Sequence, residues 1–160
     1  MKKFAILSIA SLMTLSVAHA EQPTQYFAIG HKMITMENAG EEADVVGTQL
    51  TYGKRIHEKV VLEGNLVTFY DTVHVDASSI DLSALIYPIN NQLHIRVGVT
   101  DGEVNGQGQL GELASDTSEI LGVGYSWLVG SSSGLRLEYT KSSIEDFDFD
   151  GFTLSVAARF

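Results

Sequence analysis

The chain has 160 residues, with 20 acidic residues against 10 basic ones and no cysteine. This length is enough for one domain, and the acidic balance argues against nucleic-acid binding, which needs a basic surface. Without cysteine, the stability of the fold has to come from packing and hydrogen bonding, not from disulfides.

Residues 1–20 have the pattern of a secretory signal peptide. Lys2 and Lys3 form a charged start, residues 4–17 are mostly apolar, and Ala18-His19-Ala20 gives a small-x-small cleavage site. The apolar run of ~14 residues is shorter than the about 20 residues of a membrane-spanning helix. We therefore expect cleavage after Ala20 and a mature domain of residues 21–160, whose formal charge is −12 once the two signal lysines are removed from the total of −10.

The last ten residues, GFTLSVAARF, alternate strictly between an apolar face and a polar or small one. The apolar face carries Phe152, Leu154, Val156, Ala158 and Phe160. Period-two alternation predicts a β-strand with one face in an apolar environment. A strand that ends on an aromatic residue suits the closure of a barrel in lipid, where an open sheet edge would leave backbone groups without partners.

Seven further segments repeat this alternation, so the sequence predicts an all-β domain of eight strands. The predicted strands cover about residues 25–36, 45–53, 59–70, 79–87, 93–100, 118–128, 135–141 and 151–160. Long polar connections alternate with short ones along the chain, beginning and ending with a long one. An antiparallel up-and-down β-barrel with long loops at one end and tight turns at the other has this pattern.

Two kinds of barrel fit the alternation, because a soluble barrel turns its apolar face inward and a membrane barrel turns it outward. The polar face here is rich in glycine and small residues and carries charges of both signs, which suits a narrow interior where charges must pair. Outward aromatic residues fall near both ends of the predicted strands, as expected where a bilayer meets water. Six form these two groups: Tyr52, Trp127 and Phe160 near the short turns, and Tyr70, Tyr139 and Phe152 near the long loops. These features favour a transmembrane barrel.

The closing strand ending in Phe160, the signal peptide and the eight alternating segments resemble the small outer-membrane barrels of the OmpA, OmpX and Ail type. The resemblance covers residues 21–160. It implies short periplasmic turns, long extracellular loops, a location in the bacterial outer membrane beside lipopolysaccharide, and a C-terminal strand that is read by the barrel assembly machinery through Phe160. It also implies a structural or surface-interaction role, such as adhesion, with no cofactor.

Charged residues of both signs lie on the predicted inward face. Five of them are candidates for one network, namely Lys32, Glu63, Arg96, Arg136 and Glu138, and Arg159 shares the same face. We expect these five to form an ion-paired network that plugs the lumen, because an unpaired charge in such an interior costs several kcal/mol. A gated or narrow porin-like pore is the alternative interpretation, although eight strands leave no aqueous channel.

The acidic segment before the closing strand, Asp146-x-Asp148-x-Asp150-Gly151, matches only the first half of a calcium loop, since Ala157 stands where a bidentate Glu is needed. We expect a solvated acidic loop there, with Asp146, Asp148 and Asp150 as weak metal candidates. The acidic loops as a group are candidates for divalent cations that bridge to lipopolysaccharide. His74, Phe147 and Phe149 in the predicted loops are candidates for contact with a host or surface ligand, and packing of these residues on the rim of their own barrel is the alternative.

An enzyme is the main alternative to a structural or binding protein, because lipid A-modifying enzymes also use eight-stranded barrels. Such enzymes need a nucleophile beside a base. The mature chain has four histidines, none in a His-x-Ser pattern, and His94 reads as an inward core residue. We therefore expect no enzyme.

Overall fold

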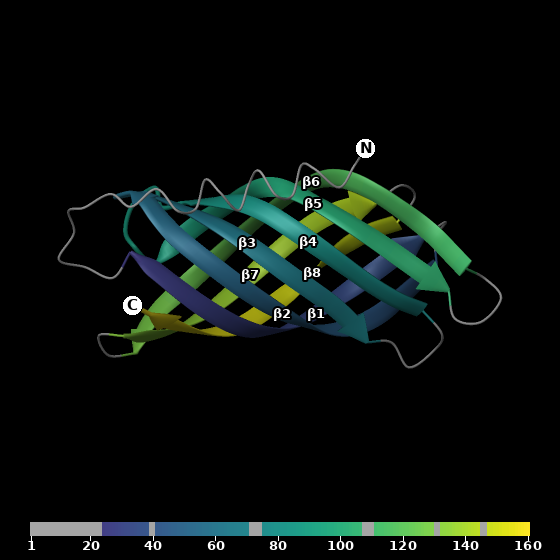
Figure 1. The fold of residues 1–160 in the computed structure, drawn as a ribbon, viewed down its shortest axis with the longest axis horizontal. Coiled ribbons are helices and arrows are strands. Elements are labelled where there is room, and N and C mark those ends of the chain that lie inside the picture. The colour runs from purple at the N-terminus through teal and green to yellow at the C-terminus, as the bar shows by residue number, and fades with distance from the viewer. Residues whose placement is uncertain (1–23, 39–40, 71–74, 107–110, 130–131, 145–146) are drawn as a thin grey trace.

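The computed structural model describes residues 24–38, 41–70, 75–106, 111–129, 132–144 and 147–160. Within these ranges the chain forms a closed barrel in which each strand pairs antiparallel with its neighbour in sequence and the last strand pairs with the first (Figure 1). The strands are β1 Gln25–Asn38, β2 Glu41–His57, β3 Val60–Tyr70, β4 Val75–Ile86, β5 Leu93–Gly106, β6 Gly111–Val129, β7 Ser133–Ile144 and β8 Phe147–Arg159. No helix among these residues is long and apolar enough to cross a membrane. Residues 1–20, expected to be a signal peptide, lie outside the described residues.

The barrel has two ends, which we name by what they carry. The terminal end holds Gln25, where β1 begins, and Phe160, and the backbones of these two residues exchange hydrogen bonds of 3.0 and 3.4 Å. The acidic end is the opposite one, where β1 leads to β2, β3 to β4, β5 to β6 and β7 to β8. Its exposed or half-buried carboxylates include Glu37, Asp44, Asp101, Glu103, Asp116, Glu119, Asp148 and Asp150.

Most strands extend further at the acidic end than the sequence pattern predicts. β1 runs to Asn38 and β2 begins at Glu41, where the sequence suggested a polar loop of residues 37–44. β6 likewise begins at Gly111, well before the predicted start at residue 118. The longest segment between two strands is residues 87–92, at the terminal end. The predicted strand bounds at the acidic end were wrong, because backbone pairing between neighbouring strands continues after the apolar alternation has ended.

The apolar face of every strand points outward. Phe27, Ile29 and Met33 on β1 are each more than half exposed, and Phe152, Leu154 and Val156 on β8 are similarly open. The remaining strands expose the predicted apolar positions in the same way, among them Leu50, Leu66, Ile80, Ile95, Val97, Val99, Leu121, Val123, Leu135 and Leu137. Apolar side chains outside and polar ones inside are the arrangement of a transmembrane barrel. The predicted fold class is confirmed.

Aromatic side chains gather near both ends of this apolar belt. At the terminal end, the Phe27 ring lies 5.2 Å from that of Tyr52 and 5.5 Å from that of Phe160. The rings of Tyr139 and Phe152 lie 5.1 Å apart nearer the acidic end. Aromatic rings prefer such interfacial positions because they are apolar with a polar edge. The side chain of Tyr70 lies outside the described residues.

The interior also contains apolar side chains, in two clusters. Ile34, Val45, Val67, Phe69 and Phe149 pack together toward the acidic end. Val61, Leu85 and Tyr87 form a smaller cluster toward the terminal end. The interpretation of Phe149 as an exposed loop aromatic was wrong, because this residue belongs to β8 and only 7% of it is exposed.

Candidate functional site in the lumen

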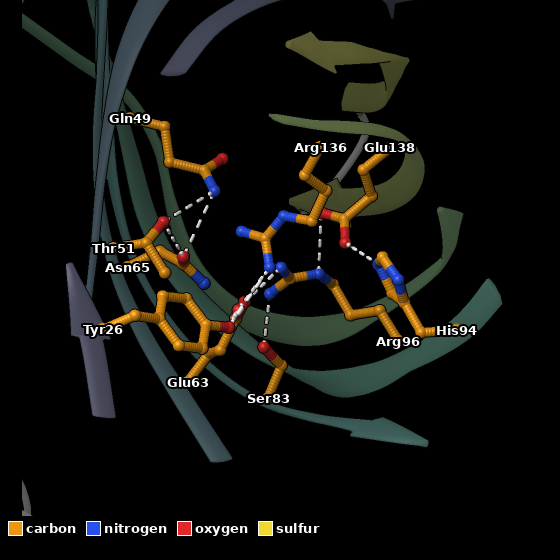
Figure 2. A network of polar contacts seen from close by, with 10 residues as sticks. All are labelled: Tyr26, Gln49, Thr51, Glu63, Asn65, Ser83, His94, Arg96, Arg136 and Glu138. Carbon is orange, nitrogen blue, oxygen red and sulfur yellow. Dashed lines mark hydrogen bonds and ion pairs between the residues drawn. The ribbon is translucent and has the colours of Figure 1, made fainter. Parts of the chain in front are cut away.

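The centre of the lumen is occupied by four charged side chains from three strands. Arg96 on β5 forms ion pairs with Glu63 on β3 and with Glu138 on β7, the second through Nε and Oε1 at 2.9 Å. Arg136 on β7 pairs with the other oxygen of Glu63. None of the four is more than 5% exposed. Two guanidinium groups and two carboxylates therefore form one chain of contacts across the barrel, with no net charge (Figure 2).

Three further side chains form hydrogen bonds with these charges. The Tyr26 hydroxyl donates to Glu63, Arg96 donates to the Ser83 hydroxyl, and His94 Nε2 lies 2.8 Å from Glu138 Oε2. Because the carboxylate can only accept, Nε2 of His94 carries the proton in this contact. A buried charge is tolerable when its remaining hydrogen-bonding capacity is satisfied. These groups satisfy most of that capacity, and Arg136 Nη2 is left without a hydrogen-bond partner among the described residues.

Two glycines make room for this arrangement. A Cβ at Gly124 would lie 2.5 Å from His94 Nε2, and one at Gly53 would overlap the Tyr26 ring. Both glycines lie on the inward face of their strands, where any larger side chain would displace a partner of the network. These two inward glycines therefore leave the space that the Tyr26 and His94 side chains occupy.

A second, uncharged group lies beside the network. Gln49 Nε2 donates to Thr51 Oγ1 at 3.2 Å and to Asn65 Oδ1 at 3.1 Å, while the Thr51 hydroxyl donates to Asn65 Oδ1 at 2.7 Å (Figure 2). All three residues are buried. These contacts hold β2 against β3 on the inside of the barrel and carry no charge.

Lys32 lies apart from the other predicted charges. Its ammonium stands 5.8 Å from the centre of the Phe69 ring, and it lines a cavity of about 20 Å³ together with Asp81 and Thr100. Asp81 accepts hydrogen bonds from Ser79 at 2.9 Å and from Thr100 at 2.8 Å. A cavity of this size holds about one water molecule. The structure therefore brings together Glu63, Arg96, Arg136 and Glu138, and it places Lys32 with Asp81 in a separate group toward the acidic end.

The remaining candidates that the structure describes lie outside the lumen. Asp148 is exposed, Asp150 accepts a hydrogen bond of 2.8 Å from the Tyr139 hydroxyl, and Asp146 lies outside the described residues. In the part of the chain that the structure describes, no three His, Asp or Glu side chains are grouped so that they could hold a metal ion. Phe160 is 58% exposed on the outer wall against Phe27, and its role as an assembly signal stays a prediction.

Sequence reasoning missed several members of this site. Tyr26 and Ser83 were not singled out as partners of the charges, and the two apolar clusters were not expected. The alternation along each strand could have placed Tyr26 and Ser83 on the inward face. Tyr26 precedes the inward Ala28 by two residues, and Ser83 lies midway between the inward Asp81 and Leu85. This alternation alone did not show which inward residues share the same height in the barrel.

Solved structures show the same architecture. The attachment invasion locus protein Ail of Yersinia pestis superimposes with a TM-score of 0.65 at 18% identity, over 87% of this chain and 99% of that one. Neisserial surface protein A gives a TM-score of 0.66 at 18% identity, over 85% and 97% of the two chains. This chain has the fold of small outer-membrane barrels.

The N-terminal β-barrel domain of Pseudomonas aeruginosa OprF is more distant, with a TM-score of 0.54 at 15% identity over 83% of this chain and 97% of that one. Ail has also been solved in complex with the heparin analogue sucrose octasulfate. No family model and no curated protein matches the sequence.

Proposed function

We propose that this protein is an integral outer-membrane barrel with a plugged lumen, which acts as a structural or surface-interaction protein and neither conducts nor catalyses. The location is supported by the outward apolar belt, the aromatic residues near its two ends, the fold it shares with outer-membrane proteins and the expected signal peptide. In this proposal the C-terminal strand with Phe160 is recognised during assembly, and the terminal end faces the periplasm.

The observation that carries the proposal is the network of Glu63, Arg96, Arg136 and Glu138. Its members come from β3, β5 and β7, so the contacts cross the interior and do not line one wall. Along the barrel axis, the apolar cluster that contains Phe149 and Phe69 lies on one side of the network. The apolar cluster that contains Leu85 and Tyr87 lies on the other side. An ion entering the lumen would have to displace apolar side chains and then break buried ion pairs, so we expect no conductance.

The acidic end supports a surface role and restricts its partners. Most exposed charges there are carboxylates, with Lys141 the exposed cation at the same rim among the described residues. Ail was solved with a sulfated heparin analogue, whereas a polyanion would be repelled by the acidic end of this chain. We propose cationic, neutral or cation-bridged partners at this end, with divalent ions between it and lipopolysaccharide as one form of bridging.

Planar-bilayer recording tests the plug. Refolded protein whose insertion is verified by a heat-dependent shift on an SDS gel should add no stable current steps, while a general porin recorded in the same bilayer should conduct. Stable nanosiemens steps from the inserted protein would favour the narrow-channel alternative. Mass spectra of lipid A from cells with and without the protein test the enzymatic alternative, and identical spectra are expected.

A further inference from the structure

A groove runs along the outer wall of the barrel at the boundary between the apolar belt and the acidic end. It has a volume of about 460 Å³ and is lined by residues of β3, β4 and β5. Two rows of cross-strand neighbours form its outward lining, namely Leu66–Ile80–Asp101 and Thr68–Ser78–Glu103. Leu66 and Ile80 of the first row continue the apolar belt. The second row has no apolar side chain and marks the boundary of the belt.

The lower part of the groove is suited to a hydrocarbon chain. Leu66 is 54% exposed and Ile80 is 45% exposed, and both point away from the barrel. They lie beside each other on adjacent strands, directly paired in the β3–β4 register. An acyl chain packed against them would bury apolar area in continuity with the rest of the belt.

The upper part of the groove presents oxygen acceptors with few partners of their own. The Asp101 and Glu103 carboxylates are exposed, and neither forms an ion pair with a cationic side chain among the described residues. Asp101 accepts a long hydrogen bond of 3.3 Å from Thr117, and Glu103 accepts one of 3.4 Å from Ser78. Both bonds are at the weak end of the range, so the carboxylates remain open to a stronger donor.

We propose that this groove binds a membrane lipid whose headgroup carries a primary ammonium group. The acyl chain lies against Leu66 and Ile80, and the ammonium donates to Asp101 and Glu103. The ligand class follows from charge complementarity, because the groove lining contains two carboxylates and no basic residue. A primary ammonium has three N–H donors, whereas a quaternary choline headgroup has none and an anionic headgroup is repelled. This inference rests on the proposed membrane location.

The absence of cysteine from the chain makes a site-specific test direct. A single cysteine at Leu82→Cys places a fluorophore on β4 two residues below Ile80, about 7 Å along the strand. A second protein carries the label at Met33→Cys on the outer face of β1, away from the groove. Each labelled barrel is inserted into phosphatidylcholine vesicles doped with acyl-chain nitroxide lipids bearing ethanolamine, choline or glycerol headgroups.

The ethanolamine lipid should quench the fluorophore at position 82 about 1.5- to 5-fold more efficiently than the choline lipid, as expected for one or two exposed charged contacts. Position 33 should show no headgroup preference. The double variant Asp101→Asn/Glu103→Gln should abolish the preference at position 82. The variant Glu37→Gln/Asp44→Asn removes the same charge from another part of the rim and should leave the preference intact.

Equal quenching by all headgroups at position 82, or the same preference at position 33, would overturn the proposal. A preference for the anionic glycerol lipid that requires Mg²⁺ and is lost in EDTA would also overturn it, because a bridging cation would then be the ligand. A barrel that fails to insert, seen as a missing heat shift on the gel, would refute the proposed function and the groove site with it.

Discussion

Replacement of Arg96 by methionine is the most direct test of the lumen network. Arg96 pairs with Glu63 and Glu138 and also donates to Ser83. Without the guanidinium, Glu138 retains the contact with His94 among these bonds, and both carboxylates stay buried. Removing one partner of a buried ion pair costs about 3–5 kcal/mol, because the other charge is left uncompensated. We expect Arg96→Met to lower the free energy of unfolding by about this amount.

The free energy of unfolding can be measured by urea titration of the protein in lipid vesicles. Trp127 is the only tryptophan, and its side chain lies on the outer wall beside Tyr125, so its fluorescence reports the loss of lipid contact. Lys141→Met is the matched control, since this lysine is exposed at the rim and its loss should change stability by less than about 0.5 kcal/mol.

Removal of all four charges distinguishes a network from a set of independent contacts. The variant Glu63→Gln/Arg96→Met/Arg136→Met/Glu138→Gln should be more stable than Arg96→Met alone, because no unpaired charge remains inside. If Arg96→Met costs less than about 1 kcal/mol, as exposed pairs do, the lumen is solvated and the reasoning about a plug fails.

Three further predictions concern packing and closure. Phe149→Ala should lower the free energy of unfolding by about 3–5 kcal/mol, because it leaves a cavity inside the barrel. Phe152→Ala, on the lipid-facing side of the same strand, should cost clearly less because lipid fills the gap. Equal losses in urea unfolding would contradict the inward assignment of Phe149. Gly151→Val should reduce the yield of the heat-modifiable form on an SDS gel, because a Cβ at this position would overlap the Met33 carbonyl oxygen at the β1–β8 seam, and a normal yield would argue against this register. Deletion of Phe160 should slow folding into vesicles, since it removes the stacking on Phe27 and two backbone hydrogen bonds at the seam; unchanged kinetics would limit its role to recognition.

The sequence was sufficient to predict the face of each strand but not the length of the strands. Alternation is visible only where one face contacts lipid, so the predicted strands ended where the outward apolar residues ended. The ladder continues beyond the belt because backbone hydrogen bonds need no apolar side chain, as the pairing of Glu37 with Glu42 shows. Phe149 was misread for this reason, since its acidic neighbours Asp148 and Asp150 made the segment look like a loop.

The members of the charge network could be predicted as inward residues, but their connections could not. In a barrel the rows of paired residues are inclined to the axis, so two residues of one row can differ in height. Lys32 pairs with Thr153, which pairs with Glu138, and yet Lys32 lines the cavity with Asp81 toward the acidic end. Which inward charges meet depends on the stagger of the strands in the closed sheet. The alternation of residue types along the chain does not show this stagger.

The distribution of charge then separates what holds the barrel together from what it presents to its surroundings. The lumen network contains two arginines and two glutamates, so its field largely cancels within the interior. The field outside comes from the rims, which are acidic at one end and carry Lys54, Arg55, Lys59 and Arg159 at the other. Because like charges repel across the headgroup layer, the acidic rim cannot attract anionic lipid by itself. An anionic lipid held at that rim must therefore bring a bound cation with it, whereas a lipid with an ammonium group brings the positive charge itself.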